Sequence, residues 1–135
     1  MLSSRHDILV TTPISQIKHA AREAEACIKL GGGYYFRKFA RLPKILRSGG
    51  SKIFYVEDGY IRGFGVVTDI AWRDNMTDAI SGEVWGAGHY ISIPADTWTW
   101  IRPIPHKGFQ GFRYWAGKEY EIVGNWLIPM PEVEG

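Results

Sequence analysis

The stretch "KIFYVEDGYIRGFGVV", residues 52–67, decides the fold. Asp58-Gly59 separates two runs rich in β-branched and aromatic residues, and this dipeptide favours a type I′ turn, which needs positive φ at both central positions. The stretch therefore predicts a β-hairpin. Gly63 and Gly65 share one face of the second strand, where glycine is typical of a bend, a bulge or a close approach by another segment.

Before this hairpin, residues 8–12 are typical of a short strand, and "TPISQIKHAAREAEACIKLGGG" (12–33) predicts a helix. Thr12 can cap the helix, and Pro13 suits its first turn. One apolar stripe recurs at helical spacing; its members are Ile14, Ile17, Ala21, Ala24 and Ile28. The three glycines at 31–33 then end the helix.

The remaining segments complete the predicted fold. Short helical turns are expected around Pro43 in "YYFRKFARLPKILRSGG" (34–50), and a connecting loop in "RDNMTDAISGEVWGAG" (73–88). Four further strand-like runs follow: "HYISIPA", "TWTWIRPIP", "GFQGFRYW" and "YEIVGNWLIPM". We therefore expect a single α+β domain over residues 1–135, a small closed mixed β-barrel with one main N-terminal helix and short accessory helices.

The charge of the chain is unevenly distributed. The net charge is only +2, but residues 26–56 carry seven of the sixteen basic residues and no acidic one, which leaves nine basic and fourteen acidic residues elsewhere. This asymmetry favours an anionic partner, although a solvated surface gives the same pattern. The candidate phosphate contacts are the five cations of the central part of this run: Arg37, Lys38, Arg41, Lys44 and Arg47.

Other residue types limit the possible chemistry. Cys27 is the only cysteine, which excludes an internal disulfide and suits a reducing compartment, and we interpret it as a small buried hydrophobe. The four histidines, His6, His19, His89 and His106, never fall at metal-ligand spacing. We expect no metal, no cofactor, no membrane-spanning segment and no signal peptide, and hence a cytoplasmic protein.

The order of features in "LPKILRSGGSKIFYVEDGYIRGFGVV" (42–67) resembles the core of the PUA-like superfamily, which includes the PUA, ASCH, EVE and YTH domains. The EVE-like branch is the most similar in length. The resemblance implies a pseudo-barrel that binds DNA or RNA and takes one base, in some members a modified one, into an aromatic-lined pocket. The sequence departs from the superfamily at Ser51, where an acidic residue is common, and it lacks the ASCH signature G-x-K-x-x-E-x-R.

Aromatic residues are the candidates for such a pocket, because a base needs a π-face or a guanidinium to stack on. In "PHKGFQGFRYW" (105–115), strand alternation separates Phe112 and Tyr114, which we assign to the core, from Arg113 and Trp115. The candidate base-pocket residues are Gln110, Gly111, Arg113, Trp115, Trp72 and Trp85. An alternative is that Arg113 only covers Trp115. Trp98 and Trp100 are expected in the core.

Two other function classes stay open. Some ASCH-type proteins are amidohydrolases that act on acylated nucleosides through a Lys, a Thr and a Glu, and Lys18, Thr68 and Glu57 are present here. The aromatic surface could instead serve a protein partner. Nucleic-acid binding without turnover is the function we expect; the oligomeric state is not predicted.

Overall fold

The computed structural model describes residues 6–11, 34–39, 41–77, 84–109, 111–115, 119–125, 127–128 and 131. The larger of its two main sheets has six strands. In spatial order they are β10 (Phe112–Trp115), β1 (Asp7–Thr11), β3 (Lys52–Glu57), β4 (Tyr60–Val66), β9 (Thr99–Pro105) and β11 (Ile122–Asn125). Strands β1 and β3 are parallel, and the other neighbours are antiparallel.

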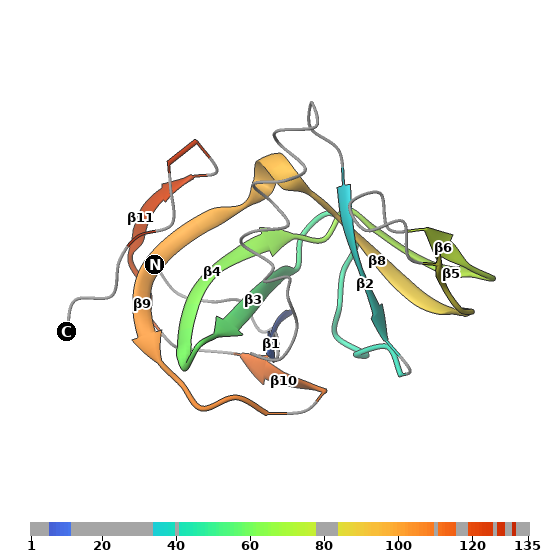
Figure 1. The fold of residues 1–135 in the computed structure, drawn as a ribbon, viewed down its shortest axis with the longest axis horizontal. Coiled ribbons are helices and arrows are strands. Elements are labelled where there is room, and N and C mark those ends of the chain that lie inside the picture. Colours follow the sequence, from blue (N-terminus) through green and yellow to red (C-terminus); the bar gives the residue numbers. More distant parts are fainter. Residues whose placement is uncertain are drawn as a thin grey trace.

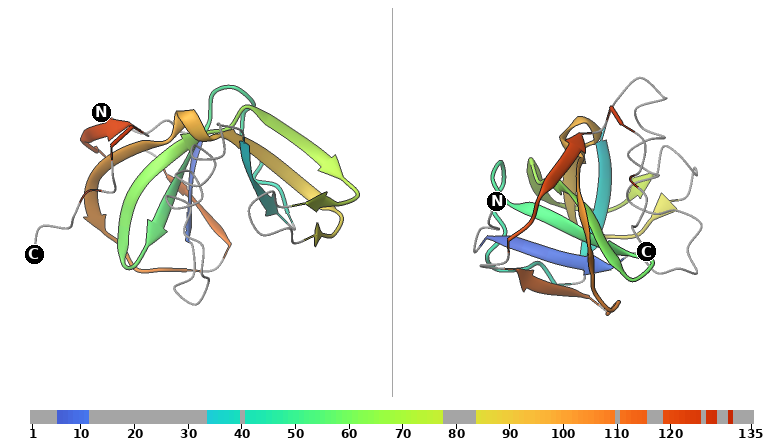
Figure 2. Two further views of the ribbon diagram at one scale, coloured as in Figure 1. Left: turned by 45° about the horizontal axis from the view of Figure 1, so that its top comes forward. Right: turned by 90° about the vertical axis from the view of Figure 1, so that its left-hand side faces the viewer.

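The second sheet has three antiparallel strands in the order β2 (Tyr34–Phe39), β8 (Gly88–Pro94) and β5 (Asp69–Arg73). A two-stranded piece, β6 (Met76–Thr77) with β7 (Val84–Trp85), lies beyond the end of β5. The 3-10 turn η1 (Ala95–Thr97) joins β8 to β9 and so links the two sheets. In Figure 1 and the left view of Figure 2, the sheets extend to opposite sides of this link like the two arms of an arch.

The predicted fold class, an α+β closed barrel, is wrong. Among the described residues, the regular structure is β-strand apart from η1. The six-stranded sheet curls strongly but stays open, because its outer strands β10 and β11 pair with β1 and β9 and not with each other. The main N-terminal helix predicted after Thr12 lies outside the described residues. The described residues form a mostly β structure whose two main sheets are open.

Residues 34–39 also differ from the prediction, which placed short helical turns in the segment around Pro43. They form strand β2, whose register pairs Arg37 with Ile91 and Phe39 with His89 on β8. The aromatic residues of β2 and the tyrosine and isoleucines of β8 suit a sheet. Strand β8 lies about fifty residues further along the chain, so a local sequence pattern could not predict that β2 pairs with it.

The β3–β4 hairpin is confirmed. Asp58 and Gly59 have φ values of 53° and 81°, as a turn with positive φ at both central positions requires. The pairing of β4 shifts register next to Arg62 on both sides, which marks a bulge. Of the two glycines, Gly63 shows the close approach: a Cβ atom added to it would lie 2.4 Å from the Thr99 carbonyl oxygen.

The central strands are buried on both faces. Along β3, Ile53 and Tyr55 contact one hydrophobic cluster, whereas Phe54 and Val56 contact another on the opposite face. The first cluster joins the two sheets and includes the buried Trp98 and Trp100, Phe39 and Leu46 and the β8 residues Ile91 and Ile93. The expectation that the two tryptophans lie in the core is confirmed, since each is only 1% exposed.

The second cluster is largely aromatic. Phe54 lies parallel to Trp115, with 4.9 Å between ring centroids, and meets Phe64 and Tyr120 at steeper angles. Such contacts stabilise a core beyond the effect of buried area alone. No helix of membrane-spanning length and hydropathy occurs in the part of the chain that the structure describes.

Candidate functional site

The segment between β2 and β3, residues 41–51, carries three of the candidate phosphate-binding cations and has a defined conformation. Its buried Ser51 accepts a hydrogen bond from the Arg47 backbone N–H at its Oγ (2.7 Å) and donates its own N–H to the Arg47 carbonyl (3.0 Å). Leu46 is buried in the cluster between the sheets, and Leu42 and Ile45 pack against it. We call residues 41–51 the basic segment.

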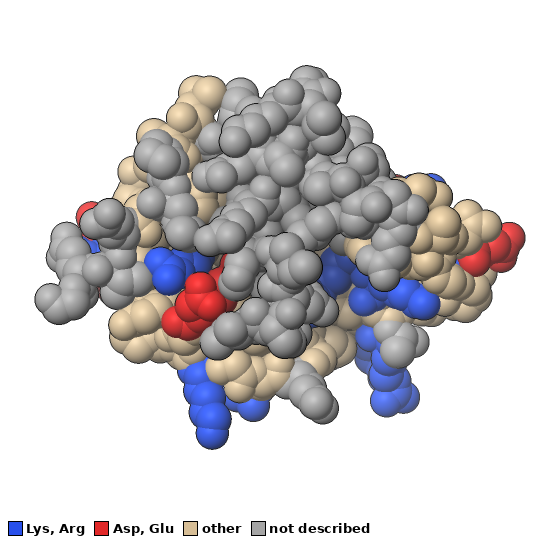
Figure 3. Space-filling view, in the orientation of Figure 1, with Lys and Arg blue, Asp and Glu red and all other residues tan. Residues whose placement is uncertain are grey.

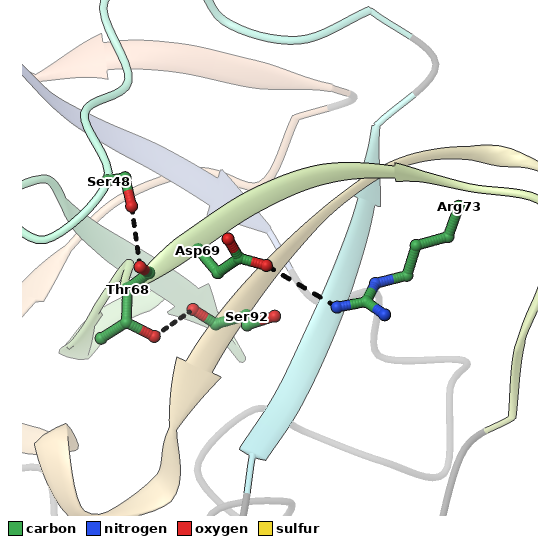
Figure 4. A network of polar contacts seen from close by, with 5 residues as sticks. All are labelled: Ser48, Thr68, Asp69, Arg73 and Ser92. Atoms are coloured by element: carbon green, nitrogen blue, oxygen red, sulfur yellow. Dashed lines mark hydrogen bonds and ion pairs between the residues drawn. The ribbon is translucent and has the colours of Figure 1, made fainter.

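The basic segment is also held to the second sheet. Ser48 Oγ donates to the Thr68 carbonyl (2.7 Å), and the Gly49 N–H donates to the Val67 carbonyl (2.7 Å). Thr68 in turn donates to the Ser92 carbonyl on β8 through both its N–H and its hydroxyl. Figure 4 shows the hydrogen bonds that the side chains of Ser48 and Thr68 make in this series, which ends at Ser92. The segment therefore has a fixed position relative to β5 and β8.

Among the described residues, no carboxylate forms an ion pair with the exposed cations of this region. Arg41, Lys44 and Arg47 are exposed, as is Lys38 on β2. The ion pairs seen among the described residues are elsewhere, between Arg73 and Asp69 (3.7 Å, Figure 4) and between Arg102 and Glu121 (3.2 Å). Figure 3 shows Lys and Arg side chains projecting at separate places along the lower edge of the molecule, with an acidic group above those at the lower left.

Arg37 differs from the other four cations because it is partly buried. Its guanidinium carbon lies 5.9 Å from the Phe39 ring centroid and 6.0 Å from that of Tyr55. Its Nε has no hydrogen-bond acceptor among the described residues. Lys38, on the opposite face of β2, lays its carbon chain against Gly88, where an added Cβ would lie 2.6 Å from the Lys38 Cε. Two neighbouring cations are thus presented on two different faces.

A row of aromatic side chains crosses from the second sheet to the first. The contacts are 5.0 Å between the centroids of Trp72 and His89, 6.1 Å between Phe39 and Phe112, and 5.5 Å between Phe112 and Tyr114. His89 and Phe39 are register partners on β8 and β2, which joins the two halves of the row. Phe39 is buried, whereas Trp72 and Tyr114 at the two ends are 59% and 56% exposed. We call these five residues the aromatic row.

The predicted base-pocket residues lie in different surroundings. Trp115 is buried against Phe54, and Trp85 lies parallel to the buried Tyr90 at 6.3 Å, whereas Trp72 is exposed on β5. Gln110 lies outside the described residues. The described tryptophans of this set are therefore not brought together into one pocket.

In the strand that was to form the pocket wall, the core position of Phe112 is confirmed, whereas that of Tyr114 is wrong. Phe112 faces the cluster between the sheets, whereas Tyr114 is exposed and Trp115 is buried on the other face. Gly111 is exposed with φ of 75°. Arg113 lies over the ring of Phe109, with 4.4 Å to its centroid, so a cation–π contact occupies one side of its guanidinium.

One cavity of about 370 Å³ is lined by described residues that the sequence did not single out: Arg102, Pro103, Ile104, Glu119, Tyr120 and Glu121. It carries two carboxylates, and Arg102 is paired with one of them, Glu121. The cavity is open to solvent and has no excess of positive charge. An anionic ligand is therefore not favoured there.

The amidohydrolase alternative gains no support from the described residues. Glu57 ends β3, whereas Thr68 lies beside Ser51 at the strand's beginning, since the Val67 N–H donates to the Ser51 carbonyl. Six residues of extended chain separate the two positions by about 20 Å. Lys18 and Cys27 lie outside the described residues. Across the described ranges, no three metal-ligating side chains come together either.

Sequence reasoning missed His89, Phe39 and Tyr114 as members of one arrangement. Period-two alternation in "RKF" and "GHYISIP" does place Phe39 with Arg37, and His89 with Ile91, on common faces. That signal gives the face of each strand. It does not give the pairing of β2, β5 and β8, which brings the rings together.

Comparison of the chain with known proteins identifies no relative. No known protein family matches the chain, and no significant match is found among curated proteins or solved structures. The PUA-like resemblance therefore stays a prediction, and the functional argument depends on the contacts, burial and charges of the residues themselves.

Proposed function

We propose that the protein binds nucleic acid, DNA or RNA, through the cations of β2 and the basic segment. The observation that carries this proposal is the set of exposed cations, Lys38, Arg41, Lys44 and Arg47, which have no carboxylate partner among the described residues. A group of positive charges held in one region attracts a polyanion before contact is made. Neutralised phosphates then supply affinity that does not depend on base sequence.

The construction of the basic segment supports binding by positioned charges. The hydrogen bonds of Ser51 and Ser48 hold the segment's backbone before any ligand arrives. Arg47 also donates from Nη1 to the carbonyls of Lys44 and Leu46, which limits the motion of its guanidinium. Less conformational entropy is then lost when a phosphate binds.

The experiment that tests the proposal compares two exposed lysines. Lys44→Gln removes a charge from the basic segment, and Lys107→Gln removes one from the loop after β9. Fluorescence anisotropy with a labelled oligonucleotide at low salt should show weaker binding for Lys44→Gln and nearly unchanged binding for Lys107→Gln. Equal effects of the two substitutions would contradict a site on the basic segment, and an absence of binding to any DNA or RNA would contradict the function itself.

A cytoplasmic location is part of this proposal, since a nucleic-acid ligand and a single cysteine both suit a reducing intracellular compartment. The proposed mechanism is binding without turnover. Incubation with an N-acylated nucleoside should therefore release neither the free nucleoside nor the acid.

A further inference from the structure

We propose that the ligand is single-stranded and that Trp72 is the residue on which one of its bases stacks. This inference rests on the proposed function and specifies its ligand. It starts from the exposure of Trp72, since 59% of this large residue remains accessible to solvent. Trp98, Trp100 and Trp115 in the same structure are each at most 5% exposed.

The Trp72 ring has a defined neighbour and an accessible surface. Its centroid lies 5.0 Å from that of His89, and the two rings are at 79°, so His89 supports it in an edge-to-face contact. Such a contact orients the indole ring without covering all of it. An oriented and exposed indole is a suitable platform for a base, because every base has a π-face and stacking tolerates any sequence.

The platform is connected to the proposed phosphate-binding cations through the sheet. Trp72, His89 and Phe39 are successive register partners on β5, β8 and β2. Two strand spacings place the backbone of Trp72 about 10 Å from that of Phe39. Arg37 precedes Phe39 by two residues on the same face, and Arg41 follows it by two at the start of the basic segment.

This separation matches a short piece of one nucleic-acid strand. The basic segment begins two residues beyond Phe39, which adds at most about 7 Å of chain. At about 3.4 Å per nucleotide along a stacked strand, the whole separation corresponds to roughly three to five nucleotides. A base on Trp72 and phosphates at the basic segment can thus belong to one continuous strand. A duplex cannot use the platform without opening, because its bases are already stacked on each other and paired.

The test measures anisotropy of a labelled thymidine oligonucleotide and of a duplex of equal length with two variants. Trp72→Leu keeps an apolar side chain and removes the π-face, whereas Trp72→Phe keeps a π-face. We expect Trp72→Leu to weaken single-strand binding by roughly tenfold or more. We expect Trp72→Phe to retain most of the affinity, and duplex binding to change little with either variant.

A second readout does not depend on the Leu variant folding. A stacked base quenches tryptophan fluorescence, so the wild type should lose more emission on adding the single strand than Trp72→Phe does. If Trp72→Leu binds the single strand as the wild type does, or if quenching is equal in wild type and Trp72→Phe, the inference is wrong. Salt-dependent binding by the same samples would still support the proposed function, and no binding to either oligonucleotide would overturn both.

Discussion

Trp72 and His89 lie opposite each other on the neighbouring strands β5 and β8, with ring centroids 5.0 Å apart and ring planes at 79°. Trp115, by contrast, lies parallel to Phe54 at 4.9 Å and is 5% exposed. One tryptophan is therefore presented at the surface by a polar neighbour, and the other fills the core. The difference in burial predicts opposite effects on stability and on binding.

Trp115→Ala should lower the free energy of unfolding by about 3–5 kcal/mol, because it removes a buried indole and leaves a cavity beside Phe54. Trp72→Ala should lower it by less than about 1 kcal/mol, because most of that side chain is already in water. Urea unfolding followed by circular dichroism measures both values. Equal destabilisation by the two substitutions would mean that Trp72 has a core role.

Gly63→Ala should destabilise the protein by about 1–3 kcal/mol. The added methyl carbon would lie 2.4 Å from the Thr99 carbonyl oxygen and 2.8 Å from the Trp98 ring, so backbone or a buried indole must move. Gly50→Ala is the matched control, since nothing lies within 4 Å of its added Cβ. Thermal melting should separate the two variants clearly, and a Gly63→Ala protein as stable as the control would contradict the close packing of β4 on β9.

Ser51→Ala should cost about 1–3 kcal/mol of stability, because the Arg47 N–H then loses its acceptor next to the core. The same substitution should weaken nucleic-acid binding, because it loosens the basic segment without removing any charge. Ser48→Ala is the milder control, since its hydroxyl bonds the Thr68 carbonyl at an exposed position. If Ser51→Ala lowers the free energy of unfolding but leaves the affinity for nucleic acid unchanged, the order of the basic segment does not contribute to binding.

Substitutions of Asp7 test the hydrogen bond that joins the start of β1 to the start of β3. Its carboxylate is buried, and Oδ1 accepts a hydrogen bond from the Lys52 backbone N–H (2.9 Å). Asp7→Ala should lower stability by about 1–3 kcal/mol, since a donor at the strand's first residue loses its acceptor. Asp7→Asn keeps an acceptor oxygen in that place and should cost less. The two unfolding free energies, measured by urea titration, should fall in that order; the reverse order would argue against this hydrogen bond.

Local signals in the sequence predicted the parts of the fold that depend on local geometry. The Asp58-Gly59 turn is one example, because its positive φ values follow from residue type. Strand β2 is the opposite case, because "YYFRKF" forms a strand by pairing with the distant β8. The openness of the six-stranded sheet is likewise a property of how β10 and β11 pair, which no local pattern encodes.

The candidate site divides in the same way. Charge is visible in the sequence, so the cations from 37 to 47 could be singled out before their exposure was known. The roles of Tyr114 and Trp115 could not be assigned, because the sheet is covered on both faces and alternation then does not say which side is buried. The pairing of Trp72 with His89 depends on the contact between β5 and β8.

The salt dependence of binding tests the central claim most directly. Four phosphate contacts, from Lys38 and the three cations of the basic segment, predict a slope of log Kobs against log salt concentration of about −3 to −4. Replacing Arg41, Lys44 and Arg47 together by Gln should flatten this slope by about 2–3 while the fold is retained. A slope that is the same in the wild type and the triple variant would contradict a phosphate-binding role for the basic segment.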